Sequence, residues 1–449
     1  MYRTAISALA TRAYTRAYNR PLRSSRSLAA RSLFALSYPS YPVTMPAHLA
    51  TPVGNARRLL YLLGALAACG PLSIDMYLPA LPSMAAQFGV AEGLAQATLT
   101  TFLVGFSVGM LLYGPLSDAY GRRPVLLAGV ILYAAASLCC MLAPTILSLA
   151  SLRFVQALGA GAASVLARAI ARDAHAPADA ARVLSFLQIV TSVGPLLAPL
   201  IGGQLLLLGG WRAVFAALTA YGVLSAVLVA RRIPETWPRA KRRQAALAHS
   251  FLAYGRLLAD PTVLAYLLCG GMSFAAMFAY IAGTPFVYID YYHVSPQRYG
   301  FFFAANIVGL VGGNFLNARC VGRLGTLTLI SWASAIACGA ALLTGLACLT
   351  GWGGLPLLAT ALFFVVGTTG ILGANCVTEL MHRYPHNAGA AAALFGAVQF
   401  GLGALSGSVL GLLSNGTPLA LGGVIAACGI CMLVGRGLLR RLHGRPVKA

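Results

Sequence analysis

The sequence predicts an all-α membrane protein with twelve transmembrane helices in two six-helix bundles and with both termini in the cytoplasm. The chain of 449 residues is 59% hydrophobic and only 9% charged, with a mean hydropathy of +0.79. About a quarter of the residues are charged in a soluble domain. Apolar runs of about 20 residues recur along the chain, and each can cross a bilayer as a helix. In the strands of a transmembrane barrel, apolar and polar residues would instead alternate over short segments.

Twelve apolar runs are expected to span the membrane, and a long basic segment at about Arg231–Asp260 separates the first six from the last six. Two related six-helix halves are a known plan of transporters. The expected spans are Leu59–Leu81, Thr98–Leu116, Pro124–Leu142, Ile146–Ala167, Val183–Leu208, Val214–Ala230, Val263–Ile289, Tyr299–Ala318, Leu327–Leu349, Leu355–Val377, Gly389–Leu413 and Pro418–Gly435. The expected domains are a basic extension (1–56), a first bundle (57–232), a linker (233–260), a second bundle (261–440) and a basic tail (441–449).

The charge distribution sets the predicted orientation. The chain has 32 Lys and Arg against 9 Asp and Glu, a net charge of +23, which can indicate a nucleic-acid partner. The basic residues, however, lie at the ends of the apolar runs. The segments predicted to be cytoplasmic hold 22 of them, whereas the outer loops hold only Arg212 and Arg298. This asymmetry is typical of membrane topology, so we expect the lipid bilayer and not nucleic acid as the partner.

The first 44 residues hold seven arginines and no acidic residue. This composition resembles a transit peptide. A misassigned start codon, with Met45 as the true start, explains it equally well, and we prefer that interpretation. In either case the extension is expected to lie outside the transmembrane fold.

Asp75 is the only acidic residue inside an expected span, in the proline-rich segment Gly70–Pro82. Prolines break helical hydrogen bonds, so we expect a kink whose freed backbone groups face a cavity. A carboxyl group inside the membrane is costly, which makes Asp75 a candidate for binding and releasing protons. The alternative is an acid at the outer membrane interface.

Arg153 is the only basic residue inside an expected span. It lies ~10 Å deep, against ~9 Å for Asp75, at a helical rise of ~1.5 Å per residue. The matching depths predict that Arg153 acts on Asp75 and holds it ionised. The alternative is a buried arginine with a purely structural role.

The segment Gly114–Pro124 joins spans two and three and reads Gly-Pro-Leu-Ser-Asp-Ala-Tyr-Gly-Arg-Arg-Pro. Asp118 can pair with Arg122 or Arg123, or bind at a helix N-terminus, and Gly121 permits a tight turn. A latch here would favour one state of a two-state transporter. The alternative is a simple anchor of the topology. The candidate latch residues are Gly114, Asp118, Gly121, Arg122 and Arg123.

Span five is rich in glycine and proline, which allow close helix packing and bending. These residues are Gly194, Pro195, Pro199, Gly202 and Gly203. Polar and aromatic side chains inside other spans suit the mixed lining of a drug cavity, although each alone is better explained by packing. The cavity candidates are Tyr77, Gln156, Phe274, Met277, Phe278, Asn306 and Asn375, and Tyr280 and Asn314 share their character.

These motifs together resemble the major facilitator superfamily, and within it the Bcr/CflA drug:proton antiporters. Asp75–Pro82 resembles the first-span signature of that subfamily, and 114–124 resembles the G-x-L-x-D-x-x-G-R-R loop. The segment 153–159 is similar to the R-x-x-Q-G-x-G motif, and 194–203 to the antiporter motif. The resemblance covers about residues 57–440. Ala119, Ala157 and Ala198 depart from these patterns, and Ala119 weakens the charge network expected around Asp118.

The resemblance implies an inner-membrane monomer that exports amphiphilic drugs in exchange for protons by alternating access. It implies that Asp75 carries the proton and Arg153 tunes it. It also implies that the proton gradient supplies the energy, with no cofactor. A symporter or facilitator for a metabolite is the alternative within transport.

Other functional classes fit less well. An intramembrane serine protease would need a histidine in a span, and all seven histidines lie outside the expected spans. The same distribution gives no Cys/His metal site. No G-x-x-x-x-G-K-[ST] sequence is present, which excludes a P-loop in this chain. A receptor or scaffold would not explain the one buried acid and the one buried arginine.

Overall fold

The structure is a computed structural model that describes residues 53–242 and 246–442. Within these ranges every regular element is helical. The predicted basic extension up to residue 52 and nearly all of the basic tail lie outside the described residues. The fold class expected from the apolar runs is confirmed.

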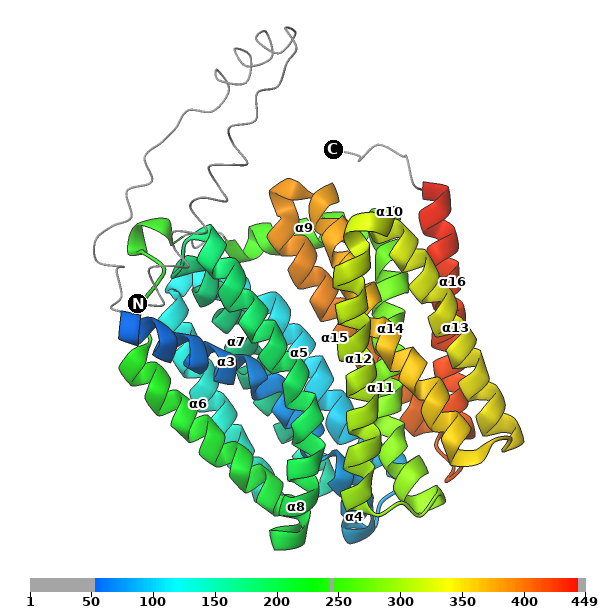
Figure 1. The fold of residues 1–449 in the computed structure, drawn as a ribbon. Helices are drawn as coiled ribbons and strands as arrows, with labels where there is room; N and C mark the ends of the chain where they lie inside the picture. The colour runs from blue at the N-terminus through cyan, green and yellow to red at the C-terminus, as the bar shows by residue number, and fades with distance from the viewer. Residues whose placement is uncertain (1–52, 243–245, 443–449) are drawn as a thin grey trace, which may run out of the picture. The chain divides into compact units, whose positions relative to one another are not determined.

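The first half of the fold contains the helices that precede the basic linker (Figure 1). They are α3 (Val53–Asp75), η2 (Leu78–Ala80), α4 (Leu81–Phe88), α5 (Glu92–Tyr120), α6 (Arg122–Met141), α7 (Ile146–Asp173) and α8 (Pro177–Arg232). Helix α7 packs against α3, α5 and α6, and α8 packs against α3 and α6. These contacts form one bundle.

The second half follows a linker that holds η3 (Arg239–Lys241) and α9 (Ala246–Leu258). It comprises α10 (Pro261–Tyr266), η4 (Leu267–Gly271), α11 (Met272–Pro285), η5 (Phe286–Tyr291), α12 (Pro296–Leu324), α13 (Thr326–Thr350), α14 (Gly354–Arg383), η6 (Pro385–Asn387), α15 (Ala388–Leu413) and α16 (Leu419–Leu442). Helix α11 packs against α14, α15 and α16, and α13 packs against α14 and α16.

Eleven helices in the described residues are long and apolar enough to cross a membrane, and α8 accounts for the twelfth predicted span. Its apolar part runs for 51 residues, or ~75 Å at ~1.5 Å per residue, more than twice the thickness of a hydrocarbon core. The backbone leaves the helical region at Gly209 and Gly210. Predicted spans five and six lie on either side of this break, so the chain makes twelve crossings.

The predicted kink in the first span is a complete break. Helix α3 ends at Asp75, a turn of 3₁₀-helix follows over Leu78–Ala80, and α4 begins at Leu81. Pro79 and Pro82 stand at the starts of these two elements, where a missing N–H costs little. The acidic side chain therefore sits at the end of a helix inside the apolar bundle.

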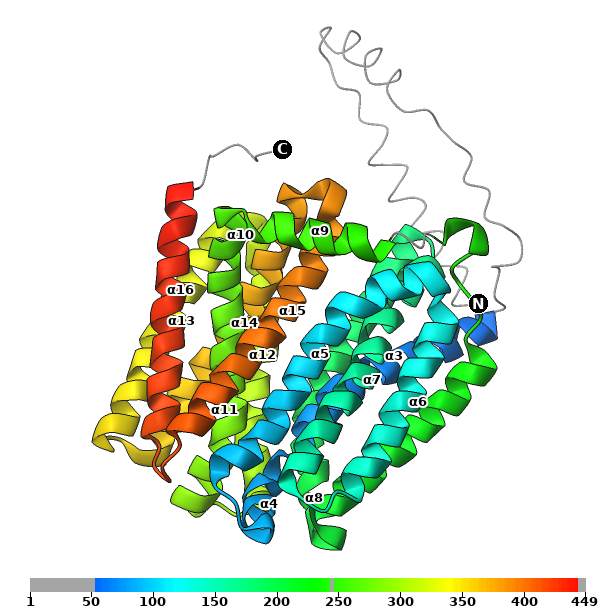
Figure 2. The same ribbon diagram turned by 180° about the vertical axis from the view of Figure 1, so that it is seen from behind.

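The two halves pack against each other through α5 and α15 on one side and α8 and α12 on the other. Figure 2 shows α5 beside α15, and Figure 1 shows α8 beside α12. We call the end that carries Arg122, Arg231 and Arg383 the arginine-rich end. At the opposite end Gly93 of α5 lies against Gly411 of α15. The halves therefore meet closely at the end away from the arginines.

Candidate functional site

Asp75 is enclosed at the break in the first span. Its side chain is 3% exposed, and its Oδ1 atom has no hydrogen-bond partner. Neither of the two pockets described below is lined by Asp75. The cavity expected beside this carboxyl group stays a prediction.

Arg153 is fully buried in the first half and is held by hydrogen bonds. Its Nη2 donates to the carbonyl of Ser73 at 2.9 Å, and its Nη1 donates to Oε1 of Gln156 at 2.5 Å. The guanidinium also lies 4.4 Å from the ring centre of Tyr77 and 4.2 Å from that of Phe102. These contacts stabilise a cation that would otherwise be costly in an apolar bundle, although its Nε atom has no hydrogen-bond partner.

Arg153 forms no ion pair with Asp75 in this conformation, so the expected action of Arg153 on the carboxyl group does not rest on direct pairing. The ion pairs of the described residues include neither side chain. Asp75 stands two residues after Ser73, and residues at this spacing point to different sides of a helix. The Ser73 hydroxyl bonds Tyr133 of α6 at 2.7 Å, so Ser73 faces the interior of the first half and Asp75 faces elsewhere.

Asp75 lies close to the second half. Its carboxyl group is within electrostatic range of the hydroxyls of Tyr280 on α11 and Tyr299 on α12. Element η2, three residues beyond Asp75, also contacts both α11 and α12. From the sequence, Tyr280 was only a possible cavity residue, and its position along the chain did not predict that it lies near Asp75.

Two of the candidate latch residues, Asp118 and Arg122, form part of a charged cluster at the arginine-rich end. Arg122 is 7% exposed; its Nη1 lies 2.6 Å from Oδ1 of Asp118 and its Nε donates to Asp173 at 2.9 Å. The pairing expected for Asp118 is confirmed. Gly121 has φ of +105°, a value that favours glycine and that confirms the predicted turn. Arg123 points away, and it donates to the carbonyl of Ala230 at 2.8 Å.

Three linker residues complete the cluster, and the motif gave no signal of them. Glu235 accepts a hydrogen bond from the backbone N–H of Arg122 at 3.0 Å, and its other oxygen pairs with Arg242 at 3.2 Å. The ring of Trp237 lies 4.7 Å from the Arg122 guanidinium, and its N–H donates to the carbonyl of Asp118. All these partners belong to the first half and the segment that directly follows it.

The glycine-rich part of α8 packs against the break beside Asp75. A side chain at Gly202 would overlap the carbonyl of Met76, and one at Gly194 would touch Pro71. Gly203 instead faces Pro296 of the second half, with room for a methyl group at 3.5 Å. Pro195 lies half-buried and Pro199 buried between them on α8. Gly114 has open space around it, so no close approach explains that position.

Asn306 on α12 donates to the hydroxyl of Tyr280 on α11 at 3.0 Å, and the other six cavity candidates divide into three groups. Tyr77 and Gln156 lie inside the first half, where they hold Arg153. Asn375 lies inside the second half and donates to Asn317 at 2.6 Å. Neither group faces the contact between the halves, whereas the third group does.

That third group is an aromatic cluster between α5, α11 and α15. The ring centres of Phe106 and Phe400 are 4.6 Å apart, and Phe274 lies 5.0 Å from Phe400 and 4.9 Å from Phe278. Met277 is half-buried and packs at the edge of the same core. Phe106 and Phe400 were not predicted, because only the tertiary structure brings these two halves of the chain together.

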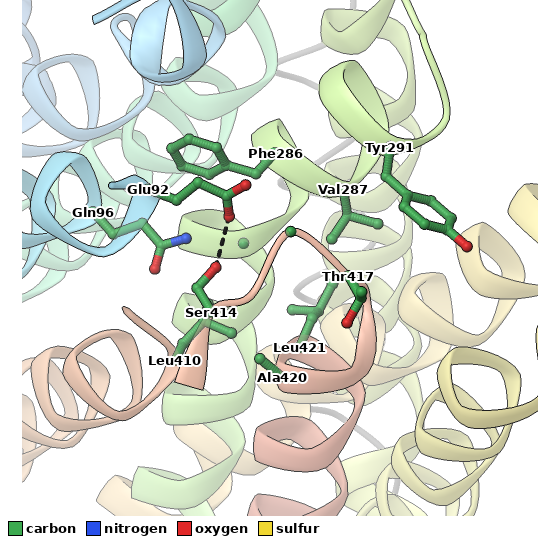
Figure 3. A pocket seen from close by; sticks show the side chains of 12 residues that line it. Glu92, Gln96, Phe286, Val287, Tyr291, Leu410, Ser414, Thr417, Ala420 and Leu421 are labelled. Atoms are coloured by element: carbon green, nitrogen blue, oxygen red, sulfur yellow. Dashed lines mark hydrogen bonds between the residues drawn. The ribbon is translucent and has the colours of Figure 1, made fainter. Parts of the chain in front are cut away.

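A small pocket lies between the halves at the end opposite the arginines (Figure 3). Ser414 donates to Glu92 across it at 2.6 Å, and Gln96 lines it with its Oε1 buried and unpartnered. Asp290 lies within electrostatic range of Glu92. A second groove, of about 340 Å³, lies between α5 and α6 and is lined by apolar residues and tyrosines such as Tyr113 and Tyr120.

Two bundles of six membrane-crossing helices, with a buried carboxyl group where they meet, define a secondary membrane transporter. The sequence profile of the Major Facilitator Superfamily matches residues 63–408. The chain belongs to this superfamily.

The chain is also similar to three individual proteins, and the names of two of them indicate a subfamily. The chain is 37% identical over 382 residues to the "Uncharacterized MFS-type transporter YdgK" of Bacillus subtilis, covering 84% of this chain and 94% of the relative. It is 33% identical to the "Bicyclomycin resistance protein homolog" of Haemophilus influenzae (82% and 92% covered) and 32% identical to "Multidrug resistance protein D" of Escherichia coli (76% and 85% covered). The names of the latter two support the Bcr/CflA subfamily that the motifs resemble.

A solved structure supports the fold alone. A D-xylose-proton symporter superposes with a TM-score of 0.66 at 18% identity, covering 85% of this chain and 97% of the symporter.

Proposed function

We propose that this transporter is a proton-coupled antiporter that exports amphiphilic drugs of the bicyclomycin, chloramphenicol or sulfonamide type by alternating access. The observation that carries the proposal is the Asp75 carboxyl group, which is 3% exposed and has an unpartnered oxygen where the halves meet. A charge there is costly without water or a partner. The protonation of Asp75 therefore depends on whether the halves admit water.

The aromatic cluster supports an amphiphilic substrate. Phe106, Phe274, Phe278 and Phe400 bring aromatic surface from both halves to one place. Ligand sites of this kind are mostly apolar with a few placed polar groups. Rocking of the halves would open and close this surface, so the same motion that exposes Asp75 would expose bound drug.

The remaining assignments follow from the same proposal. The arginine-rich end faces the cytoplasm, with both termini on that side, in agreement with the distribution of basic residues. The location is the inner membrane of a bacterium, the working unit is a monomer, and the proton gradient is the energy source. The cluster of Asp118, Gly121 and Arg122 acts as the latch that favours one state, with Glu235 and Trp237 as supporting residues, and Arg123 holds the end of α8 beside it.

Everted membrane vesicles from a pump-deficient host test this function. Addition of chloramphenicol to vesicles with an acidic lumen should release protons from the lumen as the drug enters, as followed by a pH-sensitive dye. Drug movement in the same direction as protons would indicate a symporter, and movement independent of protons a facilitator. A parallel susceptibility panel with bicyclomycin, chloramphenicol and a sulfonamide identifies the transported class.

A further inference from the structure

Helix α5 carries a row of polar side chains on the side that faces α15 of the other half. The row consists of Glu92, Gln96, Thr100 and Ser107. Spacings of four, four and seven residues place these side chains on one side of a helix. Polar groups therefore run along the contact between the two halves, from the end opposite the arginines inward.

The two ends of the row are bonded across the halves. Ser414 donates to Glu92 at 2.6 Å, as Figure 3 shows. Ser107 donates to the carbonyl of Ala397 on α15 at 2.7 Å. Both bonds stabilise the conformation in which α5 and α15 lie together.

The middle of the row is covered by glycines of α15. A β-carbon added at Gly411 would lie 3.3 Å from Oε1 of Gln96, and one at Gly407 would lie 2.9 Å from Oγ1 of Thr100. The two polar side chains are 1% and 9% exposed, and these two oxygens have no hydrogen-bond partner among the described residues. Glycine has no side chain that could supply a bond, so the approach of α15 buries both oxygens unpaired. An unpaired buried polar group is costly.

We propose that Gln96 and Thr100 set the balance between the closed and the open form of this end of the transporter. In the closed form their oxygens are buried and unpaired, whereas separation of α5 from α15 lets water bond them. The cost falls on the closed form alone, so the two residues keep that form from becoming too stable to reopen. This role rests on the alternating access of the proposed function.

The variants Thr100→Val and Gln96→Met test the role, because each replaces the unpaired oxygen by an apolar group of similar shape. Nitroxide labels on genetically encoded amino acids at the exposed positions Leu94 and Leu412 report the separation of α5 and α15 and leave the ten native cysteines unlabelled. A Ser414→Ala background weakens the closed contact and raises the population of long distances. Relief of one unpaired group predicts a roughly tenfold rise in the ratio of short to long distances in each variant.

Thermal unfolding supplies a second readout. The melting temperature should rise in both variants, and drug efflux should slow because reopening becomes harder. An unchanged or smaller ratio of short to long distances overturns the proposal. A melting temperature that is unchanged or lower also overturns it, since Gln96 and Thr100 would then have partners in the closed form. If the background shows no long distances, the melting temperature decides by the same rule.

Thr98→Val is the matched control on the same helix. Thr98 is fully buried, and its hydroxyl donates to the carbonyl of Ala95 at 2.6 Å. The loss of this bond should lower the melting temperature and leave the distances between the labels unchanged. The distances are measured without drug or a proton gradient. If vesicles move no drug, the proposed function fails for that drug, and the distances still decide the role of Gln96 and Thr100.

Discussion

The guanidinium of Arg153 donates to the carbonyl of Ser73 at 2.9 Å, two residues before Asp75. The arginine therefore holds the last turn of α3 in place and does not neutralise the carboxyl group. Element η2, which follows the break, packs against α8 of the first half and against α11 and α12 of the second. Asp75 therefore lies where the two halves meet.

Asp75→Asn should abolish proton-coupled efflux, because asparagine has nearly the same shape but binds no exchangeable proton. The measurement is drug-induced proton release in everted vesicles at matched expression. Asp179→Asn, at an exposed position paired with Arg182, is the control and should retain wild-type transport. Undiminished proton release in Asp75→Asn would refute the role of Asp75.

Arg153→Ala should lower stability by about 3 kcal/mol, because it leaves the Ser73 carbonyl and Gln156 buried without a donor. Transport should fall with it. Arg212→Ala is the control, since Arg212 is exposed and only stacks on Trp211 at 4.3 Å. Thermal unfolding in detergent, together with efflux assays, compares the two. Equal effects would remove the case for a special role of the buried arginine.

Gly202→Ala should disrupt the break in the first span, because the new methyl group would overlap the carbonyl of Met76. Overpacking of this kind costs about 1–3 kcal/mol, and we expect reduced transport as well. Gly203→Ala is a closely matched control, because its methyl group would meet Pro296 only at 3.5 Å. The melting temperatures of the two variants distinguish the positions, and indistinguishable values would contradict this account.

Glu92→Gln and Ser414→Ala should loosen the end opposite the arginines. Ser414 donates to Glu92 at 2.6 Å across the two halves, and a hydrogen bond to a charged group contributes about 1.5–3 kcal/mol. Spin labels at the exposed residues Leu94 and Leu412 would report a larger population of long distances in either variant. If both residues act through their shared hydrogen bond, the double variant should be no more open than each single variant. Additive opening would contradict this role of the bond.

Tyr384→Phe should reduce stability only within a defined pH range. Partial burial alone would raise the pKa of Asp260, but hydrogen bonds from Tyr384 and Thr262 outweigh it and lower that pKa. Burial and the bond to Asp260 raise the pKa of Tyr384 to about 12. Because folding lowers the pKa of Asp260, its carboxylate stabilises the fold above about pH 4, and this stability is lost on acidification. Because folding raises the pKa of Tyr384, its neutral phenol stabilises the fold below about pH 10, and this stability is lost towards pH 12.

The difference in unfolding free energy between wild type and Tyr384→Phe should therefore be present at pH 7 and vanish near pH 3. It should stay below about 1 kcal/mol, because the pair is partly exposed. Tyr120→Phe, at a position that is 60% exposed, should show no difference at either pH. A Tyr384→Phe effect that is the same at pH 3 and pH 7 would contradict the role of the Asp260 carboxylate.

The sequence by itself determined the twelve crossings, the distortion of the first span beside its prolines and the turn at Gly121. These features are local: apolar runs set helix length, proline removes backbone donors, and a positive φ requires glycine. Asp75 and Arg153, the two charged residues inside spans, were also found from the sequence, since charges are rare in apolar spans.

Only the tertiary structure decided the partners of those residues. Arg153 bonds Ser73 and Gln156, Asp75 lies close to the second half, and Phe106 meets Phe400 across nearly 300 residues of chain. Depth in the membrane follows from position along one helix. The direction in which a side chain points depends on how that helix is rotated against its neighbours, and packing with distant helices sets this rotation.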